Sequence, residues 1–166
     1  VFTEENPGRE LSTAAALAAA SRVLKNSNPE LAEECLSIAE SIWNTHKKES
    51  FVQKSELAVE MLRTTNKQEY SDFLVNNSEA IIANISNTGW IVGPALPLIQ
   101  NDNFKNQIKA AVQEYYEEVV ELGKKTPYGM PYEPDIWGAG WGIQNFGMKQ
   151  YYFHTSYPEI FPKKYM

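Results

Sequence analysis

The stretch NFKNQIKAAVQEYYEEVVELGK, residues 103–124, decides the fold class. Its apolar residues recur every three or four positions, which places them along one face of a helix. This stripe consists of Phe104, Ile108, Ala111, Tyr115, Val119 and Leu122. The glutamates between them form a solvated face, because they lack histidine partners and hard cations usually take loop carbonyls as well. We therefore predict a long amphipathic helix that holds no metal.

A first helix is predicted near the start of the chain. Pro7 and Gly8 indicate a turn. Ser12 or Thr13 then caps a helix that runs to about Leu24. Its body is almost entirely Ala and Leu, so a neighbouring helix can approach it closely.

A second helix begins at Asn28 and Pro29, because Asn is a preferred cap and Pro suits the first helical position. Its apolar stripe consists of Leu31, Cys35, Ile38 and Ile42. Cys35 is the one cysteine of the chain, so we expect a buried thiol and no internal disulfide.

Shorter helical patterns complete the chain. A third helix covers about 51–65, a short fourth lies around 70–74, and a helical turn holds Ile81 and Ile82. Prolines exclude a central strand from 91–99, where we favour a helix entered near Pro94 and keep irregular structure as the alternative.

A last helix covers about 142–154. No stretch alternates with period two for long, so the class is all-α, with short connections that favour antiparallel neighbours. No domain boundary is visible, so we expect residues 1–166 to belong to a single domain.

The composition limits the partners. Of the 166 residues, 43% are hydrophobic and 22% charged, which is ordinary for a globular domain with a real core. The formal net charge of −6 argues against nucleic acid and against an anionic membrane surface. No apolar run approaches the roughly 20 residues of a membrane-spanning helix.

Most motifs of catalysis and cofactor binding are missing from the chain. It has no Gly-rich phosphate loop, no paired-cysteine motif, no HExxH and no nucleophile elbow. Its two histidines, His46 and His154, lie at predicted helix ends, where surface, capping or packing roles are expected. We predict no cofactor, no metal ligand and no catalytic residue within this sequence.

The segment 128–147 differs from the rest. It holds five aromatic side chains, and its prolines stiffen the chain while its glycines permit close backbone approach. The aromatic residues are Tyr128, Tyr132, Trp137, Trp141 and Phe146. Flat rings suit the C–H faces of sugars, and nearby carboxylates and amides suit sugar hydroxyls. The polar partners are Glu133, Asp135, Gln144 and Asn145. The alternative is that the aromatic rings simply pack the helix ends.

Glu133 and Asp135 invite comparison with the carboxylate pair of a glycosidase, whose members lie roughly 5–10 Å apart. This interpretation is disfavoured on geometric grounds, because the acid and the base must flank the substrate from opposed positions, which one short loop seldom reaches. Hydrogen bonding to a ligand hydroxyl, or ordering of the loop, is the better explanation of both.

A known family resembles this chain at the string PYEPDIWGAGWGIQNFGMKQY, residues 131–151. The string is similar to the late loop-and-helix segment of glycoside hydrolase family 9, in particular the bacterial branch with an Ig-like domain before the catalytic barrel. HTSYPEIF (154–161), NPGRELSTAA (6–15) and NPELAEEC (28–35) fit the same family. The resemblance spans nearly the whole chain.

The resemblance implies helical hairpins that form part of an (α/α)6 barrel, and inverting hydrolysis of β-1,4-glucan or related β-gluco-oligosaccharides. The family's early Asp-Ala-Gly-Asp motif and late acidic motif are absent from the 166 residues. Inversion needs two carboxylates on opposite faces of the sugar. We therefore expect a partial domain that is inactive alone and has the remainder of its own catalytic domain as partner. The resemblance also implies a secreted, periplasmic or cell-surface location.

Substrate contact is what the resemblance implies for particular residues. Trp137 and Trp141 match tryptophans near the family's cleft, and Tyr132 and Asp135 match its loop pattern. Phe146 stands where relatives often have Trp. Ser12 and Thr13 also match a cleft-facing helix start, with capping as their alternative role.

Two other functions stay open at this point. A non-catalytic helical scaffold or carbohydrate-binding module would explain the missing carboxylates. A helical-barrel lyase or epimerase would be expected to bring arginines to an acidic substrate, and the aromatic segment contains none.

Overall fold

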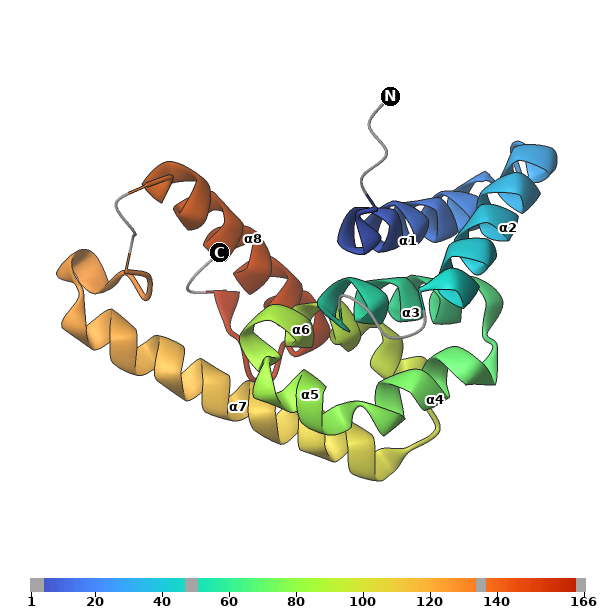
Figure 1. The fold of residues 1–166 in the computed structure, drawn as a ribbon. Coiled ribbons are helices and arrows are strands. Elements are labelled where there is room, and N and C mark those ends of the chain that lie inside the picture. Colours follow the sequence, from blue (N-terminus) through green and yellow to red (C-terminus); the bar gives the residue numbers. More distant parts are fainter. Residues whose placement is uncertain (1–4, 47–50, 134–136, 164–166) are drawn as a thin grey trace. The chain divides into compact units, whose positions relative to one another are not determined.

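The computed structural model describes residues 5–46, 51–133 and 137–163. Every regular element in these ranges is helical, so the predicted all-α class is confirmed (Figure 1). The chain divides into two compact units, which are described separately: residues 1–77 with 94–100, and residues 78–93 with 101–166.

The first unit contains four α-helices and a 3₁₀ turn. The helices are α1 (Pro7–Leu24), α2 (Pro29–Thr45), α3 (Phe51–Thr65) and α4 (Gln68–Asn76), and η1 (Gly93–Leu98) supplies the turn. The imidazole of His46, at the end of α2, lies 2.5 Å from the Glu10 carboxylate near the start of α1, so these two helices are antiparallel.

Helices α1 and α3 run parallel. Ser12 contacts Glu56, and further along both helices the Thr64 hydroxyl donates to the Ala18 carbonyl at 2.9 Å. Early residues of α1 therefore contact early residues of α3, and late residues contact late ones. The buried residues of α1 include Ala14, Ala15 and Ala18, whose small side chains permit close packing of neighbouring helices.

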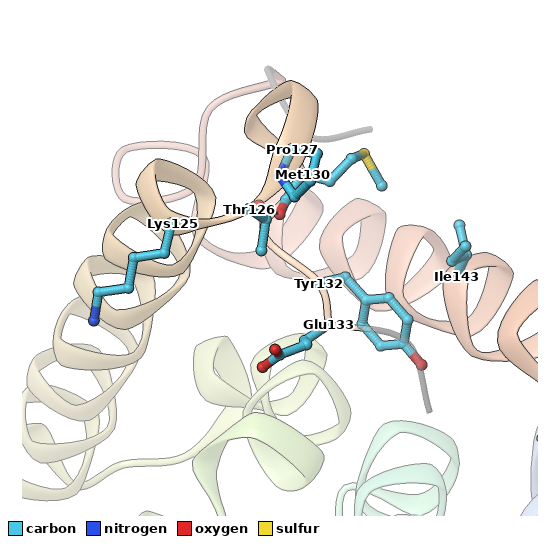
Figure 2. Close-up of a pocket in the computed structure, with 7 residues that line it drawn as sticks. All are labelled: Lys125, Thr126, Pro127, Met130, Tyr132, Glu133 and Ile143. Carbon is cyan, nitrogen blue, oxygen red and sulfur yellow. Dashed lines mark hydrogen bonds between the residues drawn. The ribbon is translucent and has the colours of Figure 1, made fainter. Parts of the chain in front are cut away.

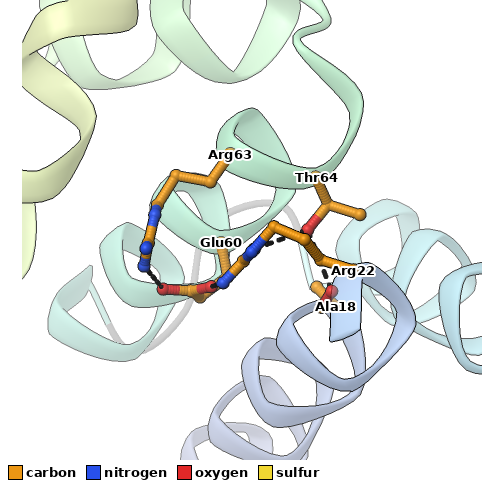
Figure 3. A network of polar contacts seen from close by, with 5 residues as sticks. All are labelled: Ala18, Arg22, Glu60, Arg63 and Thr64. Carbon is orange, nitrogen blue, oxygen red and sulfur yellow. Dashed lines mark hydrogen bonds and ion pairs between the residues drawn. The ribbon is translucent and has the colours of Figure 1, made fainter. Parts of the chain in front are cut away.

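A polar network fastens the far ends of α1 and α3 (Figure 3). The Arg22 guanidinium donates to the Glu60 carboxylate at 2.6 Å and to the Thr64 hydroxyl at 2.8 Å. Arg63 donates to the other Glu60 oxygen at 2.6 Å. Glu60 thus holds two arginines from two helices, and it is the centre of the network.

The end of α2 is held by a buried lysine of α3. The Lys54 ammonium lies 3.6 Å from the centroid of the Trp43 ring and donates to the Trp43 carbonyl. The same indole meets the rings of Tyr70 and Phe73 from α4 edge-on. These contacts join α2, α3 and α4 into one core.

The second unit contains α5 (Ser78–Ala83), α6 (Ile85–Val92), α7 (Asp102–Lys125), η2 (Pro127–Gly129) and α8 (Ala139–Ser156). Helices α6 and α8 are parallel, because Asn87 bonds Lys149 and, further along both helices, Trp90 contacts Tyr152. Helix α7 runs antiparallel to α8: its Tyr115 meets Phe153, and its earlier Lys109 pairs with the later Glu159.

Aromatic side chains fill the core of the second unit. Phe153, Tyr157 and Phe161 are fully or almost fully buried, and the Phe153 and Phe161 rings stack with centroids 4.7 Å apart. The Tyr157 hydroxyl donates to the Gly89 carbonyl at 3.0 Å. His154 lies within hydrogen-bonding distance (2.6 Å) of the Phe161 carbonyl, so its role is to hold the turn after α8.

The first helix begins earlier than predicted. Asn6 is its cap, and its side chain accepts from the Arg9 amide at 3.1 Å, with Pro7 at the first helical position. This is the same signal that correctly predicted the start of α2. The predicted capping role of Ser12 and Thr13 is wrong: the Thr13 hydroxyl donates to the Arg9 carbonyl within the helix.

The buried face of α2 is rotated relative to the predicted apolar stripe, so this prediction is wrong. Cys35 is buried as expected, but its buried companions are Ala32 and Ala39. Leu31 and Ile38 are about two-fifths exposed. The buried residues of α2 are small, and small side chains let the backbones of α1 and α2 approach each other closely.

Two further boundaries differ from prediction. Helix α6 extends to Val92, into the start of the segment 91–99, and the 3₁₀ helix η1 takes the place of the helix expected from Pro94. Helix α8 begins at Ala139 rather than Gly142, so the second half of the aromatic segment is helical. No described helix is long and apolar enough to cross a membrane.

Candidate functional site

The aromatic segment connects the end of α7 to the start of α8 in the second unit. Helix α7 ends at Lys125, and the Thr126 hydroxyl then bonds the Met130 carbonyl across η2. Gly129 has a φ of 70°, a left-handed conformation that suits glycine. A Cβ at Gly123 would lie only 3.2 Å from the Gly129 carbonyl oxygen, so the turn packs directly on the α7 backbone.

Tyr132 lies against the first turns of α8. Its ring is 5.5 Å from the Phe146 ring, at an interplanar angle of 38°. Its hydroxyl reaches the backbone at Gly142, where a side chain would collide with it. Two of the predicted site residues, Tyr132 and Phe146, are therefore brought together as a packed and half-buried pair.

The two predicted tryptophans are exposed. The exposed fraction is 89% for Trp137 and 78% for Trp141, and within the described ranges no other aromatic ring packs on either indole. Trp137 precedes Gly138, whose φ is 74°, and Trp141 lies in the first turn of α8. These two side chains do not pack the helix ends here; they offer flat apolar surface to the solvent.

Asp135 lies outside the described residues. Of its proposed polar companions, Glu133, Gln144 and Asn145 are exposed. Carboxylate and amide groups are therefore available around the aromatic side chains, as recognition of hydroxyl groups requires.

A pocket of about 260 Å³ lies beside Tyr132, between the end of α7 and α8 (Figure 2). It is lined by Lys125, Thr126, Pro127, Met130, Tyr132, Glu133 and Ile143. Only Tyr132 and Glu133 were singled out from the sequence. The other five carry no motif, and they converge because η2 folds the chain back toward α8.

In the first unit, Ser12 lies 3.5 Å from the Glu56 carboxylate. Burial raises the pKa of Glu56, the contact with Ser12 opposes this, and the charge of Glu60 adds to it. The cleft-facing role that the resemblance implies for Ser12 stays a prediction. Among the described residues, no group of three or more His, Cys, Asp or Glu side chains is arranged to hold a metal ion.

Comparison with family models places the chain in a known family. The model of glycosyl hydrolase family 9 matches residues 1–162, which is nearly the full length of the chain. A search of curated proteins found no match to this chain.

Proposed function

Because the chain belongs to glycosyl hydrolase family 9, we propose that it forms part of a catalytic domain that hydrolyses β-1,4-glucan or related β-gluco-oligosaccharides with inversion. Its own contribution is the binding surface of Trp137 and Trp141. The observation that carries the proposal is the exposure of both indoles at the start of one helix. Large exposed aromatic groups without a packing role are typical of binding sites.

The arrangement of helices supports this proposal. Within each unit, two helices run parallel (α1 with α3, α6 with α8) and an antiparallel helix packs on them. Alternating helix directions of this kind are what helical hairpins need in order to form part of an (α/α)6 barrel. The segment with Trp137 lies at the N-terminal end of α8, and Ser12 lies toward the N-terminal end of α1.

The proposed chemistry needs carboxylates that these residues do not supply. The 166-residue sequence contains no Asp-Ala-Gly-Asp motif, and an inverting mechanism requires an acid and a base on opposite faces of the sugar. We propose that both come from elsewhere in the catalytic domain, so that the 166 residues alone bind glucan without cleaving it.

The test is to replace each tryptophan and measure glucan binding and hydrolysis with the whole protein. Losing the burial of one aromatic ring costs about 1.5–3 kcal/mol, so Trp137→Ala and Trp141→Ala should each weaken cellotetraose binding roughly tenfold to hundredfold. Trp137→Phe and Trp141→Phe keep a flat ring and should recover much of the loss. Unchanged binding in both Ala variants would reject the role of this surface.

The same experiment distinguishes the alternative, a carbohydrate-binding module without catalysis. A module should bind cellotetraose and release no shorter sugar in the whole protein. A family 9 hydrolase should release products, and their anomeric configuration, followed by NMR, should be inverted.

A further inference from the structure

We propose that the pocket beside Tyr132 is a second glycan site, which holds one neutral pyranose unit apart from the two exposed tryptophans. The proposal rests on the proposed function, because it assumes a glucan ligand. It adds a site in which Tyr132 and Glu133 are joined by residues that carry no sequence motif, among them Lys125, Pro127, Met130 and Ile143.

The size and lining of the pocket suit one sugar ring. Its volume of about 260 Å³ lies just below the range of about 300 to 1,000 Å³ that is typical of sites for drug-sized ligands. Pro127, Met130, Tyr132 and Ile143 supply apolar surface for the C–H face of a pyranose. Glu133 belongs to the lining and is exposed, and its carboxylate oxygens are acceptors for sugar hydroxyls.

The charges around the pocket favour a neutral ligand. Among the residues that the structure describes, the lining includes one acidic residue, Glu133, and one basic residue, Lys125, so these two formal charges are equal and opposite. Arginine binds the carboxylate of an acidic sugar in a bidentate manner, and none of the described lining residues is an arginine.

The pocket is held in shape before any ligand binds. The Thr126 hydroxyl bonds the Met130 carbonyl, and Gly129 sits directly on the α7 backbone. Tyr132 is fixed from the other side by Gly142 and Phe146. A preformed wall reduces the entropy lost on binding, which raises affinity without new contacts.

The pocket faces a different direction from the exposed tryptophan of α8. Successive residues of an α-helix are about 100° apart, so Ile143 points about 200° around the axis from Trp141. A unit stacked on Trp141 therefore does not fill the pocket beside Ile143. The two sites can be tested separately.

The experiment follows the methyl NMR signals of the whole protein during titration with cellotetraose. Met130 and Ile143 line the pocket, whereas Met148 is exposed on α8 and does not belong to its lining, which makes it a matched control. We expect the Met130 and Ile143 signals to shift saturably and the Met148 signal to move little. Ile143→Trp, which fills the pocket, should abolish the Met130 response, whereas Met148→Trp should leave it intact.

A second variant covers the case in which Ile143→Trp fails to fold. Glu133→Ala removes an exposed side chain and should weaken the Met130 response about tenfold or more, which corresponds to about 1.5 kcal/mol for a lost hydrogen bond to a charged group. If cellotetraose binds and the Met130 signal does not shift, the pocket is not a sugar site. If the Met130 signal shifts while Trp137→Ala and Trp141→Ala bind cellotetraose normally, the pocket is a sugar site and the proposed binding role of the two tryptophans is wrong.

Discussion

The hydroxyl oxygen of Tyr132 occupies the space that a side chain at position 142 would need. A Cβ built on Gly142 would lie 2.0 Å from that oxygen and 3.0 Å from the ring carbon that bears it. Tyr132 therefore rests on the bare backbone of α8, and Phe146, one turn further along, supports its ring. The position of this aromatic wall depends on the absence of a side chain ten residues away.

Gly142→Ala should displace Tyr132 and damage the pocket. The new methyl group forces the phenol to move, and overpacking of this kind costs about 1–3 kcal/mol where neighbours cannot adjust. Because Tyr132 is half-buried and can swing outward, we expect the low end of that range in stability and a clear loss of the Met130 response to cellotetraose.

Gly140→Ala is the matched control, since nothing lies within 4 Å of its Cβ position and it belongs to the same helix. Alanine favours the helix there by about 0.5–1 kcal/mol, so this variant should be slightly more stable and bind normally. Equal binding by both variants would show that Tyr132 does not depend on Gly142.

Gly93→Ala should destabilise the packing of α6 on α8. A Cβ at Gly93 would lie 2.4 Å from the Cβ of Ser156, which is not the flexible end of a side chain. We expect a loss of about 1–3 kcal/mol in the free energy of unfolding, measured by chemical denaturation. Gly147→Ala, also in open space, should not reduce stability. A Gly93→Ala variant as stable as the parent would contradict the close crossing.

Glu56→Gln should stabilise the protein at neutral pH. Burial raises the pKa of Glu56 above its ordinary value of 4.5, so the folded state binds the proton more tightly than the unfolded state. Ionising Glu56 therefore costs stability, and this loss grows as the pH rises from about 4.5 through the raised pKa. Glutamine avoids the loss.

The measurement is the midpoint of thermal unfolding for both proteins between pH 4 and pH 8. The advantage of Glu56→Gln should be largest at the alkaline end and should shrink toward pH 4, where most of the Glu56 side chains are protonated in both states. An advantage that is the same at every pH would mean that ionisation of Glu56 is not its cause.

Glu60 should matter more than either of its arginines. Arg22→Met leaves Glu60 paired with Arg63, and Arg63→Met leaves it paired with Arg22, so each should cost about 1 kcal/mol or less. Glu60→Met leaves both guanidinium groups without this partner and should cost more than either single change. Its carboxylate side chain is only 18% exposed, so solvent replaces these contacts poorly.

The exposed pair of Glu121 and Lys124 provides the reference. Lys124→Ala should change stability by less than about 0.5 kcal/mol, because exposed ion pairs contribute little. If Glu60→Met is no worse than Lys124→Ala, the network does not hold α1 to α3.

Features that depend on near neighbours in the chain were predictable from the sequence. Asn28 and Pro29 mark the start of α2, and the spacing from Phe104 to Val119 defines the buried face of α7. The string 131–151 pointed to the family that the chain belongs to. The start of α1 was equally readable at Asn6 and Pro7, but the following Gly8 was interpreted as part of a turn.

Features that depend on what packs against a residue required the tertiary structure. Hydrophobicity favours Ile38 over Ala39 for the core, yet Ala39 is fully buried and Ile38 is exposed, on a helix that packs extensively on α1. The need for a glycine at position 93 is likewise set by a tertiary contact, since a Cβ there would collide with Ser156.

The aromatic segment shows the division most clearly. Its composition alone determined that flat rings and carboxylates would be concentrated between two helices. Only the fold decided that Tyr132 and Phe146 pack together while Trp137 and Trp141 remain exposed. The physical reason is that composition sets which contacts are chemically favourable, whereas the crossing of α7 and α8 sets which side chains meet and which face the solvent.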